Sequence, residues 1–146
     1  MIPDSVTSIG IDAFCGCTDL ISIKVGKNNR VYNSHDNCNA IIITSTNTLI
    51  AGCNNTVIPY GVRYIGCNAF AGCKGLSSVT IPNSVKSIEW RAFYGCTGLT
   101  FITIPTSVTE LDFKAFEGCK NLIIHAPVNS FAIKYAEKNR IKYQKP

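Results

Sequence analysis

A period of 23 residues constrains the fold of this 146-residue chain more than any other feature. Regular units begin at Ile58-Pro59, Ile81-Pro82 and Ile104-Pro105 and read I-P-x-x-V-x-x-I-x-x-x-A-F-x-G-C-x-x-L-x-x-V-x. An earlier copy begins at Ile2-Pro3. Because this copy precedes Ile58 by 56 residues, one longer and degenerate unit must occupy roughly residues 25 to 57.

The spacing of apolar residues inside one unit predicts short strands. In residues 76–82, Val79 and Ile81 alternate with polar neighbours, which is typical of a half-buried strand. Residues 85–88 form a second short extended stretch, and residues 92–96 turn the chain back. Nine positions of each 23-residue unit are expected to point inward, and one coil cannot bury them alone. Stacked coils can bury them with strands paired in parallel about 4.8 Å apart, so we expect a solenoid with one sheet along its length.

The degenerate unit contains two β-rich runs, Asn39–Ile43 and Thr48–Gly52, around a polar turn. These runs predict a β-hairpin that projects from the second coil or replaces part of it. In the register that pairs residue 43 with residue 48, Cys38 lies opposite Cys53. Either a disulfide or two free thiols would fit this placement.

The two ends of the repeat array are expected to differ. Ser130 can cap a helix that covers the last coil, as the end of a solenoid requires. Ile2 already stands at the Ile-Pro position, so the first coil would be covered by upstream repeats of a longer protein or by another chain. We therefore expect one repeat domain over residues 1–146, divided into a coil (2–24), a degenerate hairpin unit (25–57), two regular coils (58–80 and 81–103) and a last coil with a helical cap (104–146).

The regular unit resembles the BspA-like leucine-rich repeats, also called the Treponema pallidum type. The resemblance rests on residues 81–88 and 92–99, which read IPNSVKSI and AFYGCTGL, and it extends over nearly the whole chain. It implies a right-handed leucine-rich-repeat coil. It also implies a bacterial protein that is secreted or held at the cell surface, with relatives linked to adhesion and to the binding of host matrix proteins.

Position along the chain accounts for half of the cysteines and for most of the net charge. Four of the eight cysteines share one inward position, where thiols behave as small hydrophobic groups, namely Cys17, Cys73, Cys96 and Cys119. The net charge of +5 is concentrated in residues 134–146, which predicts a basic, solvated capping segment rather than a nucleic-acid-binding face. No apolar run is long enough for membrane insertion, and the first five residues lack the features of a signal peptide.

Catalytic and metal-binding patterns are missing from the sequence. A cysteine–histidine nucleophile pair with His35 or His125 would need one of the four shared-position cysteines to face outward, and the repeat places these thiols inside. Cys15-Gly16-Cys17 lacks the second cysteine pair of a zinc site, and the carboxylates are scattered singly. The sequence therefore predicts no enzyme, no cofactor and no metal site.

Two sets of positions outside the inward set recur in successive units and are candidate ligand-binding residues. The strand face carries Ser78, Thr80, Phe101 and Thr103. The second set is an apolar column formed by Ile11, Cys67, Trp90 and Phe113. If the column is exposed, it forms a stripe centred on Trp90, whereas side chains tucked into the bend would extend the core.

These features predict a non-enzymatic protein-binding module. The resemblance points to cell-surface adhesion or host-matrix interaction, with a protein or a glycan as the partner. The alternative is a structural spacer array that self-associates through its uncapped N-terminal edge.

Overall fold

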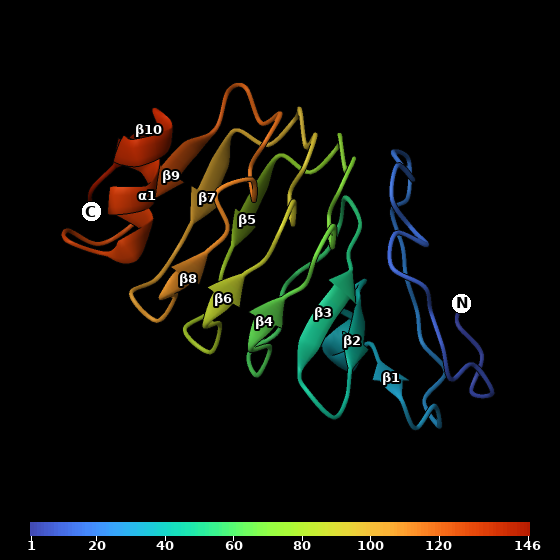
Figure 1. The fold of residues 1–146 in the computed structure, drawn as a ribbon. Coiled ribbons are helices and arrows are strands. Elements are labelled where there is room, and N and C mark those ends of the chain that lie inside the picture. The colour runs from blue at the N-terminus through green and yellow to red at the C-terminus, as the bar shows by residue number, and fades with distance from the viewer.

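The computed structural model describes residues 1–146 as a stack of coils, with the N-terminus at one end and helix α1 at the other (Figure 1). One 3-10 helix, η1 (His35–Asn37), and one α-helix, α1 (Phe131–Asn139), accompany ten short strands. The strands are β1 (Tyr32–Asn33), β2 (Ile41–Ile43), β3 (Thr48–Ala51), β4 (Tyr64–Ile65), β5 (Ser78–Thr80), β6 (Ser87–Ile88), β7 (Phe101–Thr103), β8 (Glu110–Leu111), β9 (Ile123–His125) and β10 (Lys142–Gln144).

One sheet has four parallel strands in the order β10-β9-β7-β5. Ser78 of β5 pairs with Phe101 of β7, which pairs with Ile123 of β9. The central residues of the three strands are buried, as the alternation of apolar and polar positions predicts, and they are Val79, Ile102 and Ile124.

A second sheet has six strands in the order β1-β2-β3-β4-β6-β8. Strands β3, β4, β6 and β8 are parallel, and Tyr64 pairs with Ser87, which pairs with Glu110. The expectation of one sheet along the stack is therefore wrong. The stretch at 85–88 contributes β6 to this second sheet because its backbone N–H and C=O groups also need partners in the neighbouring coils.

The expected hairpin is formed by β2 and β3. Because β3 also pairs in parallel with β4, the hairpin replaces the strand that a regular coil would supply at this position. Ile43 faces Thr48 as expected, but a bulge between Ile41 and Ile42 shifts the register. The shift removes the alignment that would set Cys38 opposite Cys53, and both residues are buried free thiols.

A stack of phenylalanine rings fills the interior of the regular coils. Phe70 and Phe93 are fully buried, and Phe116 is nearly so. The backbone N–H of Phe70 donates to the Ala92 carbonyl at 2.7 Å, which links one turn to the next. In the degenerate unit Gly52 lies over the Phe70 ring, and a Cβ at residue 52 would overlap that ring.

The first coil, residues 2–24, is less buried than the regular coils. It is attached to the rest of the stack by backbone hydrogen bonds, including one from Gly16 to Ala71 at 3.2 Å and one from Asn54 to Leu20 at 3.0 Å. Several of its inward side chains nevertheless remain half-buried, namely Ile2, Val6, Ile9, Phe14 and Leu20.

The side chain of Cys17 is exposed, which corrects the expectation that it is buried like its repeat equivalents. The Cys96 thiol donates to the Phe70 carbonyl at 3.0 Å, and the Cys119 thiol donates to the Phe93 carbonyl at 3.1 Å. Each of these thiols thus points toward the preceding coil. Within residues 1–146 no coil lies on that side of Cys17, and its side chain is exposed.

Helix α1 covers the last coil with a buried face formed by Ala132, Ile133, Tyr135 and Ala136. Ser130 is the N-cap that the sequence predicts, and its Oγ accepts a hydrogen bond from the Ile133 N–H at 3.3 Å. The basic tail is more ordered than expected, because β10 within it extends the four-stranded sheet. No helix combines the length and the apolar character that crossing a membrane requires.

Candidate protein-interaction surface

The apolar column lies on the molecular surface rather than in the bend. Trp90 is 40% exposed, Phe113 is 66% exposed and Ile11 is 82% exposed. Trp90 follows β6 and Phe113 follows β8, and these strands pair in parallel. The parallel pairing therefore places Trp90 and Phe113 at equivalent positions of neighbouring coils.

Arg91 occupies a backbone conformation that few arginines adopt. Its φ is 52°, and its repeat equivalents Asp12 and Asn68 have φ values of 69° and 55°. Aspartate and asparagine tolerate this left-handed region, whereas arginine gains no local hydrogen bond there. The cost at Arg91 indicates that its side chain makes compensating interactions.

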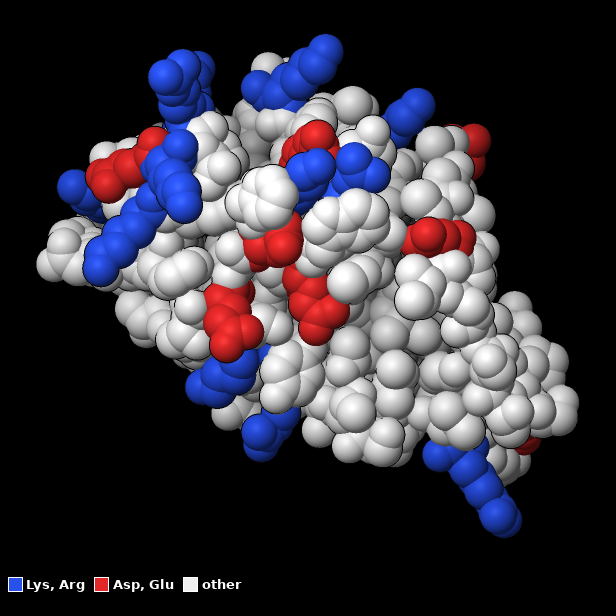
Figure 2. Space-filling view, in the orientation of Figure 1, with Lys and Arg blue, Asp and Glu red and all other residues white.

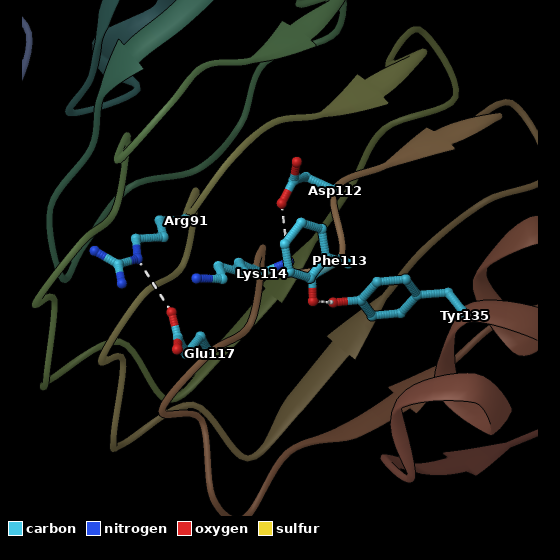
Figure 3. Close-up of polar contacts among 6 residues, drawn as sticks. All are labelled: Arg91, Asp112, Phe113, Lys114, Glu117 and Tyr135. Carbon is cyan, nitrogen blue, oxygen red and sulfur yellow. Dashed lines mark hydrogen bonds and ion pairs between the residues drawn. The ribbon is translucent and has the colours of Figure 1, made fainter.

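Those interactions order a surface cluster of Trp90, Arg91 and Tyr94. The Arg91 guanidinium carbon lies 4.6 Å from the ring centroid of Trp90 and 4.6 Å from that of Tyr94. Its Nε also donates to Glu117 Oε2 at 3.1 Å, as Figure 3 shows. The guanidinium is therefore held by two aromatic rings and one carboxylate, and part of it remains accessible, with 31% of the side chain exposed.

Phe113 is fixed by contacts with its own turn and with helix α1 (Figure 3). The Tyr135 hydroxyl donates to the Phe113 carbonyl at 3.2 Å, and Asp112 Oδ1 accepts a hydrogen bond from the Lys114 N–H at 2.9 Å. The Lys114 ammonium lies 5.6 Å from the Phe113 ring centroid. Burial raises the pKa of Tyr135 to about 12, so this hydroxyl keeps its proton at neutral pH.

We call the surface formed by Trp90, Arg91, Tyr94, Phe113 and Lys114 the aromatic ridge. Beside it lies a groove of about 540 Å³ whose lining includes Trp90 and Phe131 together with acidic residues. The acidic residues of the groove are Glu89, Glu110 and Asp112. Figure 2 shows acidic side chains gathered near the middle of this face, over the ends of β6 and β8, with most basic side chains nearer its rim.

The strand-face candidates belong to the other sheet and do not join the ridge. Ser78 and Thr80 are exposed on β5, and Phe101 and Thr103 are half-buried on β7. The Phe101 ring stacks against His125 of the next coil with 5.6 Å between ring centroids. The two sets of predicted residues are thus two separate surfaces, because each set follows a different sheet of the stack.

A cavity interrupts the apolar column between Ile11 and Cys67. It has a volume of about 270 Å³, it is mostly apolar, and it reaches the buried Tyr32. The Tyr32 hydroxyl accepts a hydrogen bond from the Ile9 N–H at 3.0 Å. The cavity lies beside the hairpin that replaces a regular turn, and the small, buried Ala51 lines it at the level of Cys67, because Leu49 pairs with Ile65.

The sequence prediction missed Arg91, Tyr94, Glu117 and Tyr135 as parts of the site. A signal for Arg91 was available, since its repeat equivalents are Asp12 and Asn68, the residue types favoured at a left-handed position. No comparable signal identified Tyr135, because its contact with Phe113 is made by a helix outside the repeats.

Stacked coils with short parallel strands and a covering helix are the architecture of leucine-rich-repeat proteins. The chain belongs to the family described as the BspA type leucine rich repeat region, which matches it in six copies over residues 1–52 and 49–134. Leucine-rich-repeat domains generally mediate protein interactions.

Two solved bacterial leucine-rich-repeat proteins are similar to the chain. One from Eubacterium ventriosum is 26% identical with a TM-score of 0.73, and the match covers 88% of this chain and 36% of that protein. One from Bacteroides ovatus is 25% identical with a TM-score of 0.55, covering 92% of this chain and 27% of that protein. The chain therefore spans only about a third of the length of these relatives. Among curated proteins, none matches it.

Proposed function

We propose that this chain is a non-enzymatic protein-binding module of a bacterial protein that is secreted or held at the cell surface. Its role would be adhesion or interaction with host matrix, through a protein or a glycan. Residues 1–146 would act as one right-handed solenoid domain, since crossovers between parallel strands almost always have that hand. Membership of a leucine-rich-repeat family supports the interaction role.

The observation that carries this proposal is the exposed cluster of Trp90, Arg91 and Tyr94. Tryptophan, arginine and tyrosine are the residue types most enriched at the energetic centres of protein interfaces. The two rings and Glu117 hold Arg91 before any partner arrives, which lowers the entropy lost on binding. The strand-face residues Ser78, Thr80, Phe101 and Thr103 are a second candidate contact surface.

Binding to immobilised matrix proteins and glycans tests the proposal. The wild-type protein, Trp90→Ala and Phe101→Ala are compared, with Tyr60→Ala as a control because Tyr60 is 84% exposed and lies outside both surfaces. We expect Trp90→Ala to weaken binding about tenfold or more and Tyr60→Ala to leave it unchanged. A loss of binding that is confined to Phe101→Ala would instead place the binding surface on the four-stranded sheet. Equal binding by all four proteins would refute a role for either surface.

One observation favours self-association as a second candidate function. The apolar side chains of the first coil are only half-buried, so its outer edge offers an uncovered surface to another chain. Sedimentation over a range of protein concentrations tests this directly. A mass that stays monomeric at the highest concentration would eliminate pairing through this edge.

A further inference from the structure

The groove beside the aromatic ridge carries three carboxylates that no cation neutralises. It opens where the paired strands β6 and β8 end, and its acidic residues are Glu89, Glu110 and Asp112. The ion pair of the structure joins Arg91 to Glu117, so none of these three carboxylates has a basic partner. Like charges in one groove repel one another, and a bound cation would relieve that repulsion.

The Ser87 hydroxyl opens into the same groove. Ser87 is 6% exposed and lines the groove, and its Oγ, which no protein group holds by a hydrogen bond, stays open to the groove. It pairs across the sheet with Glu110, so hydroxyl and carboxylate belong to equivalent positions of neighbouring coils. A ligand that excludes water from the groove would have to satisfy this hydroxyl, and an N–H donor on the ligand would do so.

Aromatic rings complete the lining. Trp90 and Phe131 border the groove, from the ridge and from helix α1 respectively. A guanidinium group stacks on aromatic faces and donates hydrogen bonds in several directions, whereas an ammonium group is compact and more strongly hydrated. Arg91 already shows this stacking on the neighbouring ridge.

We propose that the groove binds an arginine side chain presented by a basic segment of the partner protein. Carboxylates would neutralise the guanidinium, Ser87 would accept one of its hydrogen bonds, and an aromatic ring would cover its face. This inference rests on the proposed protein-binding function and deepens it by naming the chemistry of the partner. It also disfavours an anionic partner at this groove.

The test uses a short, flexible peptide that carries arginines and a matched peptide with citrulline in place of each arginine. Citrulline keeps the shape of arginine and removes its charge. Trp90 is the only tryptophan of the chain, so its emission reports directly on binding at the groove. We expect the arginine peptide to change the emission and to lose affinity as salt is added, while the citrulline peptide binds at least about tenfold more weakly.

Three variants remove the groove charges without changing side-chain size: Glu89→Gln, Glu110→Gln and Asp112→Asn. The control is Asp19→Asn, which makes the same charge change at an exposed residue of the first coil. We expect each groove variant to weaken the arginine peptide about twofold to fivefold and the triple variant to weaken it about tenfold or more. Glu110→Lys, at an exposed position, should weaken it further.

Equal binding of the two peptides, or groove variants that behave like Asp19→Asn, would overturn the inference. So would concentration-dependent oligomers that the triple variant abolishes, because the occupant would then be the basic tail of a second copy. Failure here is separable from failure of the proposed function. Matrix binding that depends on Trp90 but not on the groove carboxylates would leave the protein-binding function standing and remove only this inference.

Discussion

The rings of Phe70 and Phe93 lie stacked with their centroids 4.8 Å apart and their planes 5° from parallel. The two residues hold the same position in units 23 residues apart, and both are fully buried. Phe116 continues the stack at 5.3 Å from Phe93. This centre-to-centre distance is close to the spacing of paired strands, so the rings follow the same repeat as the sheets.

Replacement of Phe93 should destabilise the fold more than replacement of any exposed aromatic residue. Phe93→Ala removes a fully buried ring with a stacked neighbour on each side, so we expect a loss of about 3–5 kcal/mol in the free energy of unfolding. Denaturant titration measures this loss in the free energy of unfolding. Tyr60→Ala is the control and should stay within about 0.5 kcal/mol.

Trp90→Ala should cost much less stability than Phe93→Ala. Because 40% of Trp90 is exposed, we expect a loss of about 1–2 kcal/mol by the same titration. A loss of about 3 kcal/mol or more would instead make Trp90 a core residue and would remove the structural basis of the aromatic ridge.

All eight cysteines should be free thiols. Denatured protein treated without reductant should therefore titrate as eight thiols, and six would reveal a bridge such as Cys38–Cys53. In the native protein, exposed Cys15, Cys17 and Cys67 should react first. Burial raises the pKa of Cys73 to about 12, so this thiol should react only when the protein unfolds.

Stability should fall at alkaline pH. Burial raises the pKa of Tyr135 from 10.0 to about 12, and burial also raises that of Cys73 from 9.0 to about 12. The folded state thus holds these protons more tightly than the unfolded state. The resulting contribution to the free energy of unfolding is complete below about pH 9 and is lost toward pH 12. We expect each group to contribute a slope of at most about 1.4 kcal/mol per pH unit.

Denaturant titrations across this pH range measure the slope. Tyr135→Phe should flatten it, even though the variant is less stable at neutral pH because the hydrogen bond to the Phe113 carbonyl is gone. An unchanged slope in Tyr135→Phe would show that the tyrosine hydroxyl ionises equally well in both states.

The N-cap of α1 should contribute to the stability of the whole stack, because the helix covers the last coil. Ser130→Ala removes the hydroxyl that accepts from the Ile133 N–H and should cost about 1 kcal/mol. Ser130→Asp should restore most of the loss, since aspartate caps as well as serine. Thermal unfolding of the three proteins checks this, and a Ser130→Asp protein no more stable than Ser130→Ala would rule out capping.

Much of the fold was predictable because identical spacings recur. Units with the same apolar positions can bury them only by stacking, and this predicted the short parallel strands and the inward Phe93. The hairpin was predicted from two β-rich runs around a polar turn, and Ser130 from its residue type at the start of a helical segment. The number of sheets was not predictable in the same way. A two-residue strand such as β6 has too few residues to show an alternating pattern, and it becomes a strand only when β4 and β8 lie on either side.

The candidate site, too, could be predicted from the sequence only in part. The sequence by itself determined that Trp90 and Phe113 occupy equivalent positions outside the inward set, because the period assigns every residue a place in its coil. Only the tertiary structure decided that these side chains are exposed, that Arg91 lies between two rings, and that Tyr135 holds the Phe113 turn. Exposure and side-chain contact depend on what the neighbouring coils and the final helix cover, and a repeat pattern read one unit at a time does not contain that information.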